Sequence, residues 1–331
     1  MLYVTTRSNC ETYTAAKTLT ANTAADGGMF VPFQIPSLPT DTLRGMSQEA
    51  VISAVLGLFF RNAPSEQTVL ACLGGTPFRL QNIDRKITVV QLWNNRIRAF
   101  DKIEYALYGK LCLEVPACAK TTQWAKIAIR ISVMVALLAN EDREVDIAVN
   151  AGDFLTPMAA FYCKEMGLPV GKILCVTNEN SSLWEFFTHG ELSCGSAVLP
   201  TNMPELDVVL PHQLERLIFA VSGLFAAKEF ALCAEKGKAY KYEDIYELSQ
   251  DFAVSVVSTQ RVPSVIHRIQ RSNGYVLDTY SALTFGGLQD YRATGGEIRQ
   301  TLILSDYSPV VHRGAVSSAL GVPEFKLSDL I

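Results

Sequence analysis

The sequence predicts an α/β protein organised around a β-α-β unit in the middle of the chain. Residues 145–149 have the apolar, β-branched composition of a buried strand, and residues 172–177 have a similar composition. A helix is expected over residues 156–166, because Gly167 and Pro169 follow it and both residues favour the end of a helix. Two strands joined by a helix form the unit from which parallel sheets are built.

Further elements are expected on both sides of this unit. Apolar residues recur at helical spacing over residues 47–61, and β-branched or apolar residues dominate residues 86–93 and 301–305. We expect an N-terminal α/β lobe over residues 1–92 and an α/β core domain over residues 93–331. The length of 331 residues is sufficient for two domains.

Composition and charge argue against several classes of protein. The chain is 49% hydrophobic, which is enough for a sizeable core. Its 29 basic and 33 acidic residues give a net charge of -4 without a basic block, so nucleic acid is not an expected partner. The eight cysteines form no C-x-x-C pair and the four histidines are dispersed, so neither zinc nor disulfides are expected.

The start of the chain and its apolar runs bear on location. Residues 1–7 lack the apolar core of a signal peptide. The longest apolar candidate, residues 127–138, is shorter than a bilayer span and contains Arg130. A cytoplasmic protein without a membrane span is therefore expected.

Polar residues follow the second strand of the β-α-β unit. Asn178, Glu179 and Asn180 lie at the carboxyl end of that strand, the edge at which doubly wound sheets bind ligands. The turn over residues 150–153 directs backbone N–H groups and the positive end of the next helix toward any anion nearby. This edge is expected either to hold a phosphate or to form a loop that hydrogen-bonds its own backbone.

Motifs along the chain resemble those of threonine synthase. Residues 3–7 (Y-V-T-T-R) and 26–32 (D-G-G-M-F-V-P) resemble the opening Y-x-S-T-R and D-G-G-L-Y-V-P stretches of that family. Residues 152–169 resemble its G-N-F-G-D...M-G-L-P segment, and residues 177–180 match its T-N-E-N. Further matches follow in the same order, at residues 201–219, 277–282 and 315–321.

The resemblance implies a fold and a reaction. Threonine synthase is a fold-type II pyridoxal-phosphate enzyme of tryptophan synthase β-like architecture. In threonine biosynthesis it converts O-phosphohomoserine and water into threonine and phosphate. This chemistry needs a lysine that forms a Schiff base, donors for the cofactor phosphate and a polar contact to the pyridine nitrogen.

The lysine segment of the family, H-G-P-T-L-A-F-K-D-x-A-L-Q, is similar to residues 94–106. Asp101 stands at the lysine position and Lys102 follows it. A shift of one residue at the head of a helix rotates a side chain by about 100°. Lys102 is therefore the candidate Schiff-base lysine only if the helix start is re-registered, and otherwise it is an exposed residue in water.

The other cofactor contacts are also altered. The family's G-N-F-G-D corresponds to Gly152, Asp153, Phe154, Leu155 and Thr156. An acid there repels phosphate, and a leucine in place of the second glycine prevents close backbone approach. The full set that the resemblance places around the cofactor is Gly152, Asp153, Phe154, Asn178, Glu179, Asn180, Ser305 and Asp306, of which the last two correspond to the contact with the pyridine nitrogen.

One lobe of the family has no counterpart in this sequence. After the lysine segment the family carries a lobe with a glycine-rich S-G-D-T-G loop that closes over the cofactor. Here residues 109–116 lead almost directly to residues 121–127, which resemble the N-W-A-R-I helix beyond that lobe. About a hundred residues, the size of a small domain, are missing by this comparison. The expected fold is therefore a fold-type II architecture with one mobile lobe deleted.

Three functions are weighed on these grounds. The departures favour a threonine synthase-like pseudoenzyme that holds no cofactor and has a binding or regulatory role. The second is an active pyridoxal-phosphate-dependent carbon–oxygen lyase that uses Lys102 and acts on O-phosphohomoserine or a related amino acid. The third is a module that binds a small amino-acid-like molecule or an anion in the old cleft. A protein partner or a second copy of the chain over the open edge is compatible with each.

Overall fold

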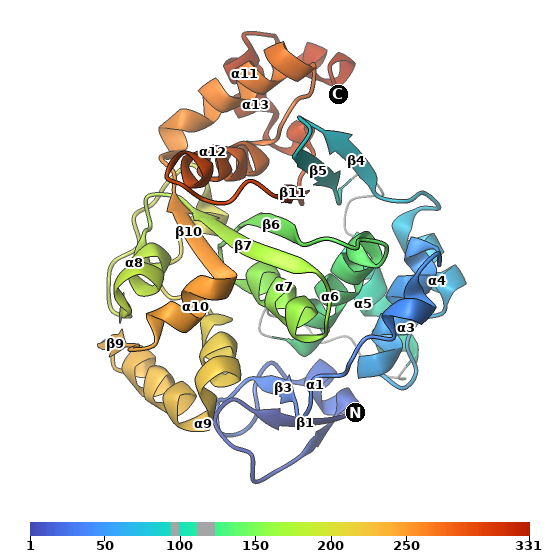
Figure 1. Ribbon diagram of the computed structural model, residues 1–331, viewed down its shortest axis with the longest axis vertical. Helices are drawn as coiled ribbons and strands as arrows, with labels where there is room; N and C mark the ends of the chain where they lie inside the picture. The colour runs from blue at the N-terminus through green and yellow to red at the C-terminus, as the bar shows by residue number, and fades with distance from the viewer. Residues whose placement is uncertain (94–98, 111–122) are drawn as a thin grey trace.

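The computed structural model describes residues 1–93, 99–110 and 123–331. Its centre is a six-stranded sheet with the strand order β10-β7-β6-β11-β5-β4 (Figure 1). Neighbouring strands run parallel except β4, which is antiparallel to β5 at one edge. The strands are β4 Arg79–Asn82, β5 Ile87–Gln91, β6 Val145–Asn150, β7 Val170–Thr177, β10 Phe252–Val256 and β11 Gln300–Ser305.

The β-α-β unit expected from the sequence is confirmed. Strand β6 is followed by α7 (Leu155–Glu165) and then by β7, which pairs with β6 in parallel. Gly167 has a φ of 96°, a left-handed conformation that glycine adopts without steric cost, and it lies just beyond the end of α7. The unit lies at the centre of the molecule (Figure 1).

Helices cover both faces of the sheet. On one face, α3 (Gln48–Phe59), α5 (Ala99–Lys110), α6 (Trp124–Leu138) and α7 form a core around the buried Trp124. On the other face lies α12 (Thr279–Ala293), which packs against α11 (Val262–Asn273). Alternate residues of β6 serve the two cores, as the period of two in a strand requires: Ile147 joins the first core and Ala148 the second.

A small antiparallel sheet of order β2-β1-β3 holds the N-terminus. The Tyr3 hydroxyl of β1 donates to the Phe59 carbonyl at 2.9 Å, which fastens this sheet to α3. Arg7 forms an ion pair with Glu215 at 3.0 Å, which fastens the sheet to α9 (Leu214–Glu235). The elements are β1 Leu2–Thr5, β2 Tyr13–Thr14, α1 Ala15–Thr20, β3 Phe30–Pro32, α2 Thr40–Leu43 and α4 Glu66–Leu73.

The expected lobe boundary falls directly after β5, at residue 92. Strands β4 and β5 belong to the sequence assigned to the N-terminal lobe, yet β5 pairs with β11 near the C-terminus. The two parts therefore share one sheet, and the division into lobes stays a prediction.

The remaining elements are α8 Ser182–His189, β8 Glu191–Ser193, α9 Leu214–Glu235, β9 Ala239–Lys241, α10 Ile245–Asp251, α13 Arg313–Leu320 and the 3₁₀ helices η1 Pro204–Leu206, η2 Thr259–Arg261, η3 Pro309–His312 and η4 Glu324–Asp329.

Helix α9 corrects the expectation about apolar runs. It is 22 residues long with a mean hydropathy of 1.7, so it could cross a membrane by length and composition alone. A core helix can pass the same test, and in α9 the Arg216 side chain is buried and donates to the Phe30 carbonyl at 3.1 Å. The backbone is not helical at Gly223 (φ 77°), which divides α9 into two segments. The sequence predicted an apolar helical face over residues 213–236 but no bilayer span there, and residues 127–138, named as the longest apolar run, are not the segment that passes this test.

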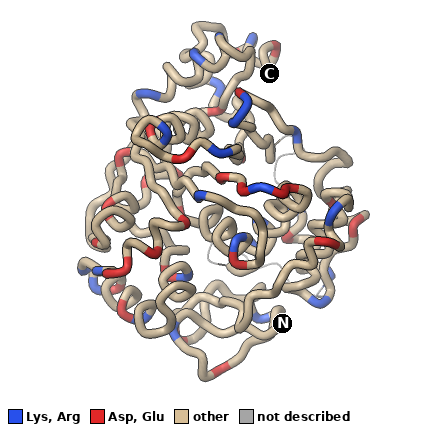
Figure 2. Tube along the Cα trace, in the orientation of Figure 1, with Lys and Arg blue, Asp and Glu red and all other residues tan. Residues whose placement is uncertain are grey.

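Charged residues of both signs are interspersed over the structure (Figure 2). This distribution agrees with the nearly balanced count of 29 basic and 33 acidic residues. Several pairs join separate elements at the surface, for example Arg261 with Asp290 at 2.5 Å. Such exposed pairs contribute little to stability, so the two apolar cores carry the fold.

Candidate functional site

The candidate site is the carboxyl edge of the central sheet. Strands β5, β6, β7 and β11 are parallel, so their carboxyl ends meet at one edge of the sheet. Polar residues end each strand there: Gln91, Asn150, Thr177 and Ser305. Parallel sheets bind ligands at this edge because loops and helix N-termini converge on it.

The turn between β6 and α7 carries an anion of its own. The Asp153 carboxylate accepts a hydrogen bond from the Leu155 backbone N–H at 3.1 Å, at the first residue of α7. Phosphates bind at helix N-termini through such free N–H groups and through the helix dipole. Because Asp153 occupies one of these donors and adds a negative charge, the turn is poorly suited to hold a phosphate.

Two unusual backbone angles shape the same turn. Gly152 has a φ of 41°, and a Cβ atom there would lie 3.1 Å from the Glu205 carbonyl oxygen. Phe154 has a φ of 68°, although it is not glycine, and its ring is fully buried against Phe187 and Phe252. A left-handed backbone conformation costs about 1 kcal/mol or more for a residue other than glycine. The packing of the Phe154 ring against the other two rings offsets this cost and holds the conformation. Phe154 therefore serves the core instead of a ligand.

Asn178 and Asn180 are saturated by hydrogen bonds within the protein. Asn178 Nδ2 donates to Thr201 Oγ1 at 3.0 Å and to Asp207 Oδ1 at 2.7 Å, and its Oδ1 accepts from Asn180 N and Nδ2, both at 3.0 Å. Asn180 Oδ1 accepts from Leu199 N at 2.8 Å. A primary amide offers two N–H donors and two lone pairs, and Asn178 uses all four. Of the two arrangements expected for residues 178–180, the structure has the loop that is held by hydrogen bonds within the protein.

Carboxylates flank this loop on both sides. Burial alone would raise the pKa of Asp207, but hydrogen bonds from Thr201 and Asn178 outweigh it and hold the pKa below its usual value. Burial opposes a similar shift at Glu179, where hydrogen bonds from its own backbone, Thr259 and Ser258 lower the pKa. Both side chains are therefore negative near neutral pH, which makes this edge unfavourable for a second anion.

Ser305 is buried in a network beneath the edge. Its hydroxyl donates to Asp278 Oδ2 at 2.9 Å and accepts from Trp93 Nε1 at 3.2 Å. Asp278 also accepts from the backbone N–H groups of Tyr280 and Ser281, so it caps the start of α12. Burial raises the pKa of Asp278, against the opposing effect of these bonds. The Ser305 donor is therefore already used.

Asp306 lies outside this network and is held by a cation. Arg130 of α6 forms an ion pair with it at 3.2 Å and lies over the Phe100 ring, 5.4 Å from the ring centre. Nearby, the Tyr307 hydroxyl donates to the Glu205 carboxylate, which links β11 to η1 across the edge. The sequence predicted no role for these three residues: Glu205 lies in the motif-matching segment 201–219, Tyr307 follows Asp306, and Arg130 was noted only as a charge within an apolar run.

Lys102 lies on an exposed side of α5. It is close to Cys72 on α4: burial raises the pKa of the Cys72 thiol, and the Lys102 charge opposes that rise. No hydrogen bond or ion pair within the described ranges joins Lys102 to Gly152 or Ser305. Asp101, at the position expected for the lysine, is half-buried in the first turn of α5.

Part of the predicted site falls outside the described residues. The first five residues of the lysine segment, 94–98, are among these. So are residues 111–122, where the missing S-G-D-T-G lobe would be inserted. The deletion of that lobe stays a prediction from the sequence.

Sequence comparisons relate this chain to known proteins. Residues 2–73 match the family model described as threonine synthase N terminus. Threonine synthase of Saccharomyces cerevisiae is 26% identical over 220 residues, which cover 60% of this chain and 43% of the yeast protein. The chain is a relative of the threonine synthases. Threonine synthase-like 1 of Homo sapiens is 28% identical over 148 residues, which cover 42% of this chain and 19% of the human protein.

Solved structures show the same fold. Pyridoxal-phosphate-bound threonine synthase from Brucella melitensis matches with a TM-score of 0.84 at 18% identity, covering 100% of this chain and 94% of that chain. The yeast enzyme matches with a TM-score of 0.79 at 19% identity and the same coverage. The architecture is that of the fold-type II enzymes, as the motifs predicted. In sequence, however, the chain spans less than half the length of these two curated relatives.

The described residues do not fit the cofactor that this fold implies. Pyridoxal phosphate needs an amine in the cleft, but Lys102 lies on the exposed side of α5 beside Cys72. It needs free N–H donors for its phosphate, but Asp153 already accepts from Leu155 N. It needs a partner for its pyridine nitrogen, but the Ser305 hydroxyl donates to Asp278.

Proposed function

We propose that this chain is a threonine synthase-like protein that does not catalyse the lyase reaction and acts through binding. The position of Lys102 carries the proposal. A lysine that attacks a carbonyl must lie within contact distance of it, and activation requires a desolvated or charge-tuned site. Lys102 is exposed on α5, one residue beyond Asp101 at the expected position, and so meets neither condition.

The phosphate end of the cleft supports the same proposal. A phosphate at the start of α7 would meet the Asp153 carboxylate, which already accepts from Leu155 N. Two like charges in contact repel by about 1 kcal/mol in water and by several times more in a partly buried site. A ligand of this edge is therefore expected to be neutral or zwitterionic.

The parts that the chain retains are those that make a rigid scaffold. The network of Asn178, Asn180, Thr201 and Asp207 fixes the loops above β7 without leaving a free amide. A rigid edge of this kind suits a partner surface better than a site that must close over a substrate. We assign the chain a binding or regulatory role, with a protein partner or a second copy as the occupant.

A phosphate-release assay tests the proposal. The purified chain is incubated with O-phosphohomoserine and excess pyridoxal phosphate, and yeast threonine synthase serves as the positive control. The proposal predicts no phosphate above the buffer blank. Release that is abolished by Lys102→Ala and kept by Lys110→Ala, a control on an exposed lysine of the same helix, would establish the lyase activity instead.

A further inference from the structure

A groove of about 660 Å³ opens at the amino edge of the central sheet, opposite the edge described above. Its floor is the amino half of β5, β6 and β11, on the sheet face that α6 covers elsewhere. The last turn of α6, which ends at Leu138, reaches the groove with Leu137, and β4 ends beside it at Asn82. The volume lies within the usual range of small-molecule sites.

Polar groups on the floor have unused hydrogen-bonding capacity. Thr88 Oγ1 donates to Asn82 Oδ1 at 2.8 Å and accepts from Gln300 Nε2 at 3.1 Å. This short chain orients both amides, since each contributes one of its two ends to Thr88. The Asn82 amide N–H groups and the Gln300 amide oxygen make no further hydrogen bond within the described residues. The floor thus offers one set of donors and one acceptor to a ligand.

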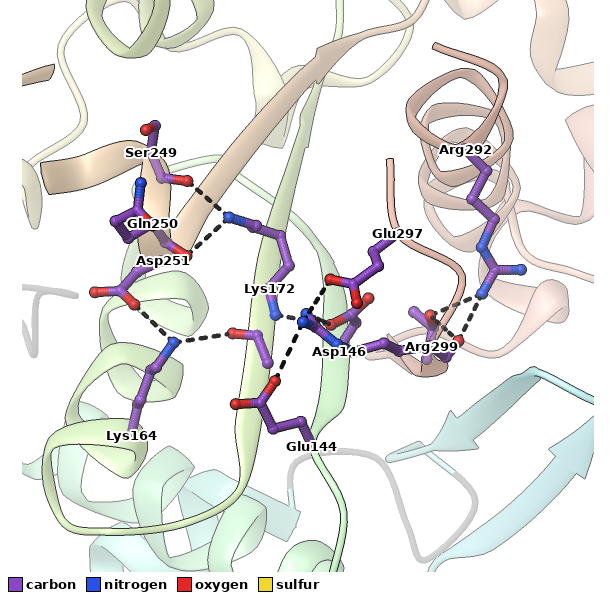
Figure 3. A network of polar contacts seen from close by, with 12 residues as sticks. Glu144, Asp146, Lys164, Lys172, Ser249, Gln250, Asp251, Arg292, Glu297 and Arg299 are labelled. Carbon is purple, nitrogen blue, oxygen red and sulfur yellow. Dashed lines mark hydrogen bonds and ion pairs between the residues drawn. The ribbon is translucent and has the colours of Figure 1, made fainter. Parts of the chain in front are cut away.

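The charges around the groove divide into a used set and an unused set. Arg299 is engaged by Glu144 at 3.3 Å, by Asp146 at 3.5 Å and by Glu297, as Figure 3 shows. The same network continues through Asp146, which accepts from the Lys172 backbone N–H at 2.7 Å. These groups satisfy one another, so they fix the rim of the groove instead of binding a ligand.

The unused set consists of two cations and one anion. Lys86 and Arg143 line the groove, and in the described parts of the chain their charged groups make no ion pair or hydrogen bond. The Glu141 carboxylate, also in the lining, is likewise without a partner there. Apolar side chains complete the walls, namely Leu80, Leu137, Ile298 and Leu302. Leu80 and Ile298 are 57% and 61% exposed, so both leave apolar surface open to a ligand in the groove.

We propose that this groove binds a zwitterionic ligand of amino-acid to dipeptide size with an apolar side chain. The ligand carboxylate lies toward Lys86, Arg143 and the Asn82 amide. Its ammonium lies toward Glu141 and the Gln300 amide oxygen. Its side chain covers the exposed parts of Leu80 and Ile298. A ligand with only one of the two charges would leave the opposite charge of the groove unpaired.

The site is independent of the proposed loss of catalysis. None of the groove residues belongs to the carboxyl edge, and the two edges are separated by the length of the strands. Substitutions in the groove therefore leave the candidate cleft intact. Failure of ligand binding here would leave the assignment of the cleft unchanged, and the reverse is also true.

Titration calorimetry of the full chain with a matched set of probes tests the inference. The probes are L-leucine and L-leucyl-L-leucine, which carry both charges, N-acetyl-L-leucine, which lacks the ammonium, and L-leucinamide, which lacks the carboxylate. A probe with both charges is expected to bind at least about tenfold more tightly than either single-charge probe, because each charged hydrogen bond contributes about this factor. The comparison of leucine with the dipeptide decides which ligand size the groove takes.

Variants test separately the residues proposed to bind the ligand carboxylate and the residue proposed to bind its ammonium. Lys86→Ala/Arg143→Ala is expected to weaken leucine about tenfold and to leave leucinamide unchanged. Glu141→Gln is expected to weaken leucine and leucinamide about tenfold and to leave N-acetyl-leucine unchanged. Lys17→Ala/Arg61→Ala, on exposed cations away from the groove, is the matched control and should bind as the parent does. No heat with any probe up to about 10 mM, or binding that the groove variants do not weaken, overturns the inference.

Discussion

Replacement of Asn178 by alanine tests whether the T-N-E-N loop is structural. Asn178 is fully buried, and its amide makes four hydrogen bonds, one of them at 2.7 Å to the Asp207 carboxylate. A neutral hydrogen bond contributes about 1 kcal/mol net, and one to a charged group contributes about 2 kcal/mol. Asp207 keeps its bonds from Thr201, at 2.7 Å from both N and Oγ1, so part of the loss is recovered. We expect Asn178→Ala to lower the free energy of unfolding by about 3 kcal/mol.

Urea unfolding followed by tryptophan fluorescence measures this change without any ligand. The matched control is Asn202→Ala, because Asn202 is exposed in the neighbouring segment and its side chain makes no hydrogen bond within the described residues. The control should change the free energy of unfolding by less than about 0.5 kcal/mol. If Asn178→Ala behaves like the control, and a stabilising effect of phosphate or amino acids disappears in that variant, Asn178 is a ligand contact and the structural reasoning is refuted.

Two further results are expected. A Cβ atom on Gly287 of α12 would lie 2.7 Å from both methyl groups of Val176, so Gly287→Ala should lower the free energy of unfolding by about 1–3 kcal/mol. Gly57 of α3 faces open space, so Gly57→Ala should raise the free energy of unfolding by about 0.5–1 kcal/mol. Urea unfolding measures both changes. Because hydrogen bonds outweigh burial and lower the pKa of Asp207 and Glu179, their stabilisation is present above the unfolded value of about 4 and is lost as the pH falls below it. The urea concentration at the unfolding midpoint should therefore decrease as the pH is lowered below about 4, and Asp207→Asn should make this decrease smaller. A urea midpoint that does not change with pH would contradict the lowered pKa values of Asp207 and Glu179.

Periodicity predicted the elements because it reports burial directly. The β-α-β unit of β6, α7 and β7 and the helix over residues 47–61 were readable, since one face of each is apolar and Gly167 or Ser47 marks an end. The order of strands in the sheet was not readable. Parallel pairing of β5 with β11 joins segments more than two hundred residues apart, and no local pattern encodes it.

The sequence predicted the chemistry of the site only through the positions at which this chain differs from the threonine synthase motifs. Sequence alone placed Asp101 at the lysine position and Asp153 in the phosphate turn. It could not show that Asp153 accepts from Leu155 N, nor that Thr201 and Asp207 saturate Asn178, because these contacts depend on loops that fold over the sheet edge. The groove at the amino edge had no motif at all, since its lining comes from three separate stretches of the chain, residues 80–88, 137–145 and 298–302.

Retention of pyridoxal phosphate distinguishes a scaffold without catalysis from a working lyase. The purified chain is incubated with excess cofactor, desalted and examined by absorption spectroscopy, and a second portion is reduced with borohydride before peptide mapping. We expect that no cofactor band survives desalting and that reduction labels no lysine selectively. A retained band that reduction fixes to Lys102, and that Lys102→Ala removes, would contradict it and would establish a relocated active site on α5.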